Sequence, residues 1–67
     1  MNTFSVGSFQ LKESQKWVPA GTLFSVDQDR MNIQEIEFSP EHGFDTKEEA
    51  DNFFRSRYIA QGYTEKT

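Results

Sequence analysis

The C-terminal part of the chain carries the most regular pattern of apolar and polar positions. Within residues 44–62, apolar side chains recur at spacings of three and four residues, which places them on one side of a helix. They are Ala50, Phe53, Phe54 and Tyr58. Thr46 with Glu49 three residues later is a capping-box pattern for the helix start. Gly62 followed by Tyr63 is typical of a left-handed helix end, so the pattern predicts one complete helix.

Before residue 40, apolar and polar residues alternate instead, which is typical of strands. Three strand segments are expected, over residues 4–12, 17–27 and 31–38. Polar turns at 13–16 and 27–30 separate them, and connections this short favour antiparallel hairpins.

In the first segment, the apolar residues change from even to odd positions at the glycine–serine step of positions 7 and 8. In a regular strand, Phe4 and Val6 would therefore lie on one face, and Phe9 and Leu11 on the other. Either a bulge at this step turns all four toward the same side, or only residues 8–12 form the strand. The sequence leaves both alternatives open.

The expected fold is of the α+β class: a three-stranded antiparallel β-meander with one C-terminal helix packed on one face (β-β-β-α). In the second segment, the parity expected to face the core holds Val18, Ala20, Thr22, Phe24 and Val26. The helix stripe is expected to meet Phe9, Leu11, Phe24, Ile36 and Phe38. We expect residues 1–67 to form a single small domain, with a core over about 3–63 and a flexible tail at 64–67.

The opposite parity supplies a candidate contact surface on the open side of the sheet. Its apolar members are Trp17, Leu23, Met31 and Ile33. An exposed apolar patch of this kind is typical of a binding surface for a second copy or for a different protein. The alternative is that Pro19, which cannot donate to a ladder, breaks the register so that Trp17 turns inward.

The net charge and the residue types of the chain limit the functions that the protein can be expected to have. The net charge is −4, and acidic residues predominate between positions 35 and 51, which disfavours binding nucleic acid through backbone charge alone. The chain has no cysteine, and its single histidine, His42, lies in a loop without a nucleophile pattern nearby. Glycine-rich phosphate loops and calcium-loop spacings are absent from the sequence. We therefore expect no enzyme activity, catalytic residue, cofactor, metal or small-molecule substrate.

No targeting segment or membrane-spanning apolar run is visible in the sequence. The expectation is a cytoplasmic protein without membrane attachment.

Three stretches resemble a group of short bacterial β-β-β-α proteins, many of which have no assigned function. They are Gly7-Ser-Phe-Gln-Leu, Trp17-Val-Pro-Ala-Gly-Thr-Leu-Phe and Phe44-Asp-Thr-Lys-Glu-Glu-Ala. The order of elements is also similar to that of HlyU-type transcriptional activators and, more distantly, of AP2-like and integrase arm-binding domains. The resemblance covers roughly residues 7–62. It implies the fold, and it implies DNA contact through the sheet face for the last group.

The sequence therefore leads to two alternative functions. The first is a protein-interaction module that uses the open sheet face, with a homodimer or another protein as its partner. The alternative is a small regulator that contacts nucleic acid.

Overall fold

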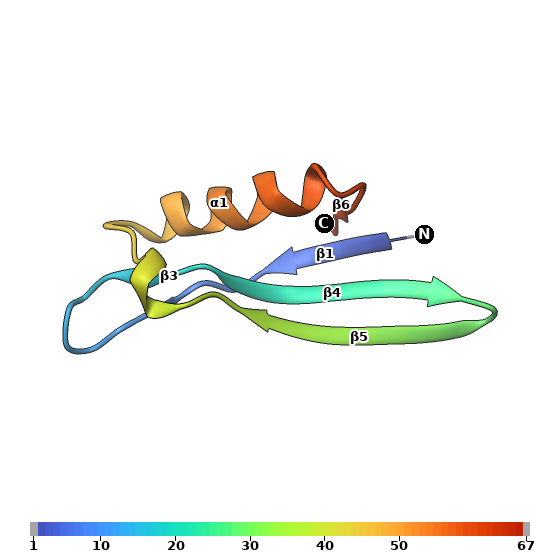
Figure 1. The fold of residues 1–67 in the computed structure, drawn as a ribbon, viewed down its shortest axis with the longest axis horizontal. Coiled ribbons are helices and arrows are strands. Elements are labelled where there is room, and N and C mark those ends of the chain that lie inside the picture. Colours follow the sequence, from blue (N-terminus) through green and yellow to red (C-terminus); the bar gives the residue numbers. More distant parts are fainter. Residues whose placement is uncertain (1, 67) are drawn as a thin grey trace.

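The computed structural model describes residues 2–66 and places one α-helix across one face of a β-sheet (Figure 1). In chain order the elements are β1 (Asn2–Val6), β2 (Phe9–Gln10), β3 (Trp17–Val18), β4 (Ala20–Asp27), β5 (Arg30–Glu37), the 3-10 turn η1 (Pro40–His42), α1 (Lys47–Ile59) and β6 (Thr64–Glu65). The α+β class expected from the sequence is confirmed.

The main sheet has the strand order β5-β4-β1-β6, and a short ribbon is formed by β2 and β3. β4 pairs with both β1 and β5 in antiparallel fashion, so the three expected strand segments are neighbours in the expected order. The three-stranded meander is nevertheless incomplete as a description. A fourth strand, β6, pairs parallel with β1, and the hairpin of the first two segments is split into two sheets.

β6 corrects the expectation of a loose tail. Thr64 and Glu65 pair with Thr3 and Phe4, and the amide of Lys66 donates to the carbonyl of Phe4 at 2.7 Å. Residues 64–66 are therefore held against the sheet edge. The remaining tail residue, position 67, lies outside the described residues, as does position 1.

The first strand segment follows neither expected alternative. β1 covers residues 2–6 and carries Phe4 into the core, whereas Phe9 belongs to β2 and is exposed. The break lies at the glycine–serine step, where the Ser8 amide turns away to donate to the Asp51 carboxylate on α1 at 3.3 Å. A matching break in the second segment lies at Pro19, between β3 and β4, because proline has no amide to donate.

The turn between β4 and β5 determines which residues share a face. Gln28 and Asp29 are its two central residues, and both have positive φ, at 50° and 65°. This conformation matches the right-handed twist of a two-residue hairpin. It places Leu23 opposite Gln34 and Phe24 opposite Ile33. The core-facing parity expected for the second segment is therefore wrong beyond Ala20: Leu23 faces the helix, and Phe24 faces away.

The core lies between α1 and the middle of the sheet. Its buried members are Phe4, Leu23, Phe54 and Tyr58, with Val6, Ile36, Phe38 and Tyr63 packed around them. The Phe54 ring is fully buried, 5.8 Å from the ring of Phe4 and 4.7 Å from that of Tyr58. Ala50 is also fully buried, as its place in the stripe predicts.

The sheet residues expected to meet the helix are confirmed only in part. Ile36 and Phe38 pack against this core as expected. Phe9 and Phe24 do not, because both belong to the opposite side. Leu11 is half-buried and lines a surface hollow together with residues 12–14 and Pro40.

Both ends of α1 follow the local signals in the sequence. The Thr46 hydroxyl accepts from the Glu49 amide at 3.1 Å and donates to the Glu49 carboxylate at 3.2 Å. The carboxylate thus meets the hydroxyl rather than the Thr46 amide that the capping box predicts. Gly62 has φ of +96°, and the Tyr63 amide donates to the Tyr58 carbonyl at 2.9 Å, which are features of a Schellman end.

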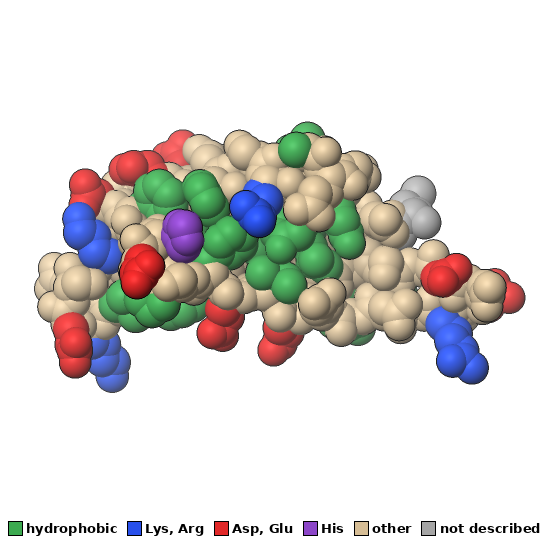
Figure 2. All heavy atoms as spheres, viewed as in Figure 1, with side chains coloured by type: hydrophobic (Ala, Val, Ile, Leu, Met, Phe, Trp, Pro, Cys, Tyr) green, Lys and Arg blue, Asp and Glu red, His purple; other side chains and the backbone are tan. Residues whose placement is uncertain are grey.

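A second aromatic group holds the 38–44 loop against the middle of α1. The ring of Phe53 lies 5.3 Å from Phe38, 5.4 Å from Phe44 and 5.8 Å from His42. Figure 2 shows hydrophobic side chains gathered between the helix and the sheet on this side of the molecule. The Arg57 guanidinium lies 5.4 Å over the Phe38 ring and covers part of the group.

Candidate functional site

The face of the sheet opposite α1 carries an exposed apolar group, which we call the open-face patch. Its members are Phe24, Val26, Met31 and Ile33. Met31 is 65% exposed, Ile33 is 62% exposed and Val26 is 49% exposed, whereas Phe24 is half-buried. The patch lies on the β4–β5 hairpin, which extends well beyond the end of α1 (Figure 1).

The register of the hairpin explains why these side chains gather. Phe24 lies opposite Ile33, and Val26 lies opposite Met31. Directly opposed residues of antiparallel strands point to the same face with Cβ atoms about 5 Å apart. Two adjacent cross-strand pairs therefore form one continuous apolar surface.

The four contact residues expected from the sequence are not brought together. Met31 and Ile33 lie on the open face as expected. Leu23 does not, since it is only 7% exposed and packs in the core. The reason is the two-residue turn, which gives Leu23 the same face as Gln34 and Ile36 rather than that of Ile33.

Trp17 is the fourth expected contact residue, and it belongs to the separate β2–β3 ribbon. It is half-buried, and its backbone exchanges two hydrogen bonds with Phe44, at 2.7 and 2.8 Å. It lies beyond the end of β4 that is remote from Val26 and Met31. Trp17 is therefore not part of the open-face patch.

Sequence reasoning missed Phe24 and Val26, although a signal for them was present. A polar turn over 27–30 makes Val26 and Met31 the first apolar pair of the hairpin, and directly paired residues share a face. Following that register along β4 and β5 would have assigned Phe24 to the side of Ile33.

One end of the patch is bordered by a cation. The Lys66 ammonium lies 4.6 Å from the centroid of the Phe24 ring, a cation–π geometry. Together with Thr3, Val26 and Met31, these residues line a shallow hollow of about 240 Å³. The strand β6 thus contributes to this surface through the residue that follows it.

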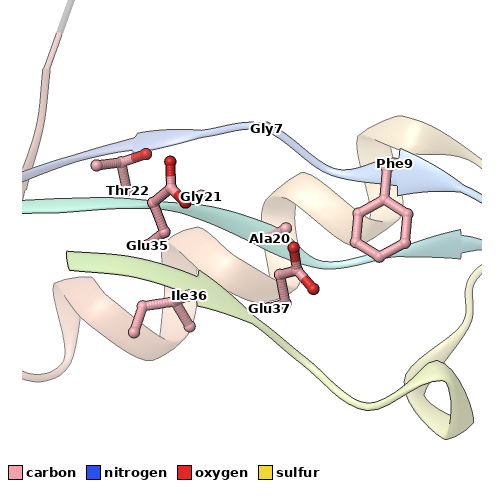
Figure 3. Close-up of a pocket in the computed structure, with 8 residues that line it drawn as sticks. All are labelled: Gly7, Phe9, Ala20, Gly21, Thr22, Glu35, Ile36 and Glu37. Carbon is pink, nitrogen blue, oxygen red and sulfur yellow. The ribbon is translucent and has the colours of Figure 1, made fainter.

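The other end of the open face is acidic. Glu35 lies opposite Thr22 and Glu37 opposite Ala20, so both carboxylates project from this face of β5. They flank a second hollow, of about 210 Å³, whose lining also includes Gly7 and Phe9 (Figure 3). Small residues therefore face this hollow from the sheet, while an aromatic ring and two carboxylates border it.

β5 is the outermost strand on its side of the sheet. The Phe38 amide donates to the Pro19 carbonyl at 3.0 Å. Phe38 therefore directs its backbone groups toward β4, and so does every second residue before it along β5. In an antiparallel ladder, successive residues direct their backbone groups alternately toward and away from the neighbouring strand. The residues that direct them toward the free edge are Met31, Ile33, Glu35 and Glu37. These are the same residues whose side chains lie on the open face.

Two titratable side chains, His42 and Asp51, take part in packing and ion pairing. His42 stacks on Phe53. Asp51 is buried, and its carboxylate accepts from the Lys47 ammonium at 2.6 Å and from the Ser8 amide at 3.3 Å. Burial opposes the charged form, but the hydrogen bonds from Lys47 and Ser8 outweigh it and lower the pKa of Asp51 below its ordinary 3.8.

Two further observations concern residues 2–66 only. No group of three or more histidine or acidic side chains in this part of the chain is arranged to hold a metal ion. No helix within these residues has the length and apolar character required to cross a membrane.

Comparison with protein-family models, with curated proteins and with solved structures gave no match for this chain. The resemblance to short bacterial β-β-β-α proteins and to DNA-reading domains therefore stays a prediction.

Proposed function

We propose that the protein is a non-enzymatic, cytoplasmic interaction module that binds another protein through its open-face patch. The observation that supports this most directly is the exposure of Met31 and Ile33 beside Phe24 and Val26 on the sheet face opposite α1. Removing apolar surface from water is favourable by roughly 25 cal/mol per Å². A partner that covers the patch gains this free energy.

Nucleic-acid contact is the second hypothesis, and the charge on the open face weighs against it. Glu35 and Glu37 project from the same face as the patch, where phosphates would be repelled. Titration with mixed oligonucleotides at low salt, followed by amide chemical shifts, tests it. Shifts confined to the open face would favour this function over protein binding.

Site-specific photo-crosslinking in the source cells tests the proposed function. A photoreactive phenylalanine analogue is placed at position 31 or 33 of the patch, with position 48 as a matched control. Glu48 is exposed on the first turn of α1, away from the patch. The expected result is a discrete protein adduct from positions 31 and 33 that position 48 does not give.

Equal labelling at all three positions would contradict the proposal. Native mass across a concentration series then identifies the kind of partner. An adduct of twice the chain mass together with a concentration-dependent mass indicates a second copy, and an adduct of different mass indicates another protein.

A further inference from the structure

Resting on the proposed function, we propose that β5 binds an extended segment of a different protein as an additional strand, and that this segment carries lysine or arginine opposite Glu35 and Glu37. Strand addition of this kind uses main-chain hydrogen bonds for affinity and alternate side chains for specificity. On β5, the residues that direct main-chain groups to the free edge also present their side chains on the open face, so the same residues supply affinity and specificity.

The length and exposure of β5 suit it to strand addition. The strand runs for eight residues, all of them exposed except Ile36, which is half-buried. No strand among residues 2–66 pairs with its outer edge. The opposite edge of the sheet ends in β6, which has only two residues. Among the described strands, β5 therefore presents the longer free ladder.

Charge argues against a second copy as the added strand. Two copies related by a two-fold axis pair their β5 edges in antiparallel fashion, with open-face residues opposite open-face residues. Depending on the register, Glu35 then meets one of four residues of the copy's β5: Met31, Ile33, Glu35 or Glu37. Each pairing sets carboxylates against each other, which is unfavourable, or places a carboxylate beside an apolar side chain, where it gains no ion pair. Arg30, the basic residue of β5, lies on the other face.

The same charges favour a basic segment. Glu35 and Glu37 both border the 210 Å³ hollow, and Phe9 forms another of its walls (Figure 3). Long basic side chains place their aliphatic stems along apolar surface while the charged head reaches a carboxylate. Phe9 and the small residues of the hollow suit the stem. Along β5, the complementary strand then carries apolar residues opposite Met31 and Ile33 and basic residues opposite the two glutamates.

Peptide binding tests this inference. The probe is a capped synthetic peptide in which threonine alternates with two lysines and then two valines, the order that an antiparallel strand requires. A matched peptide carries glutamate in place of lysine. Chemical-shift titration should show binding of the lysine peptide and much weaker binding of the glutamate peptide. Amide exchange should slow at Met31, Ile33, Glu35 and Glu37, because their amides gain acceptors.

Two variants separate strand pairing from simple charge attraction. Ile33→Pro removes one amide that points to the free edge, and proline is tolerated at such positions because the inner ladder is kept. Ile33→Thr is its matched control, since it changes the side chain but keeps the amide. Losing one main-chain hydrogen bond weakens binding by up to about tenfold, so Ile33→Pro should bind the lysine peptide correspondingly less tightly than Ile33→Thr.

Charge reversal provides the second arm. The double variant Glu35→Lys with Glu37→Lys should lose the lysine peptide and bind the glutamate peptide, whereas Glu48→Lys on α1 should change neither. Equal binding by Ile33→Pro and Ile33→Thr, or unchanged exchange at the edge amides of the wild-type protein, would refute strand addition. The exchange measurement does not depend on any variant folding. The photo-crosslinks at positions 31 and 33 would still stand in that case, so failure of this inference is distinct from failure of the proposed function.

Discussion

At the scale of single residues, Gly21 sets how closely α1 approaches the sheet. A Cβ built on Gly21 would lie 2.3 Å from the Ser5 carbonyl oxygen and 2.7 Å from the edge of the Phe54 ring. Neither neighbour moves easily, because one is backbone of β1 and the other is fully buried. Only hydrogen fits at this position without displacing the helix or β1.

We therefore expect Gly21→Ala to lower the free energy of unfolding by about 1–3 kcal/mol, the usual cost of overpacking a core. Urea unfolding followed by circular dichroism measures it. Gly7→Ala is the matched control, because a Cβ at Gly7 has no neighbour within 4 Å. An equal loss in both variants would mean that the close contact with Phe54 is not the cause.

At the scale of elements, α1 depends on local signals at both of its ends. Its first turn is fixed by the hydrogen bonds between Thr46 and Glu49, and its last turn by the positive φ of Gly62 and the contact of Tyr63 with Tyr58. These signals lie within a few residues of the helix in the sequence, which is why they could be read without the structure.

Thr46→Ala should destabilise the protein by about 1 kcal/mol, because the amide of Glu49 loses its acceptor. Thermal and urea unfolding both report this change. Thr46→Ser keeps the hydroxyl and should retain most of the stability. If serine and alanine at this position were equally destabilising, the cap would not be the source of the effect.

The β4–β5 hairpin is governed by its turn rather than by its apolar pattern. Two non-glycine residues, Gln28 and Asp29, occupy the left-handed region, which few residue types other than Gly, Asn and Asp adopt readily. The turn fixes the register, and the register places Phe24 with Ile33 on the open face. The same element thus creates the proposed binding surface and its free edge.

At the scale of the whole molecule, Asp51 joins α1 to the first strand segment of the chain. Its carboxylate lies on α1, is paired with Lys47 in the preceding turn, and accepts from the Ser8 amide where the first hairpin breaks. A buried carboxylate is costly unless its charge is compensated, so Asp51 depends on both Lys47 and Ser8.

Because the pKa of Asp51 is lowered in the folded protein, the free energy of unfolding depends on pH. A carboxyl group whose pKa is lower in the folded protein contributes stability that is present above its unfolded pKa and is lost as the pH falls through the folded value. The free energy of unfolding should therefore decrease as the pH is lowered from about 5 through the ordinary pKa of 3.8 and below. Urea midpoints across this range measure it.

Asp51→Asn is the control for this effect, because it keeps an acceptor for Ser8 but removes the titrating charge. The stability advantage of the wild-type protein over this variant should shrink with falling pH. A constant difference between the two proteins across the range would show that Asp51 does not titrate with folding.

The candidate site was only partly visible in the sequence, for a definite reason. Both parities of the second segment carry large apolar residues, with Leu23 on one and Phe24 and Val26 on the other. Alternation alone cannot then decide which set is buried. Met31 and Ile33 were found because the third segment has a clearer division, with Ile36 and Phe38 on the opposite parity.

The sequence by itself determined the α1 helix, its caps, its buried stripe and the α+β class, because these depend on residues within one or two turns of each other. Only the tertiary structure decided the break at Ser8 and the pairing of Thr64 and Glu65 with β1. Each of these depends on a backbone or side-chain partner more than ten residues away in the chain. Such partners are selected by how the helix and the strands pack together, and the linear pattern carries no record of that choice.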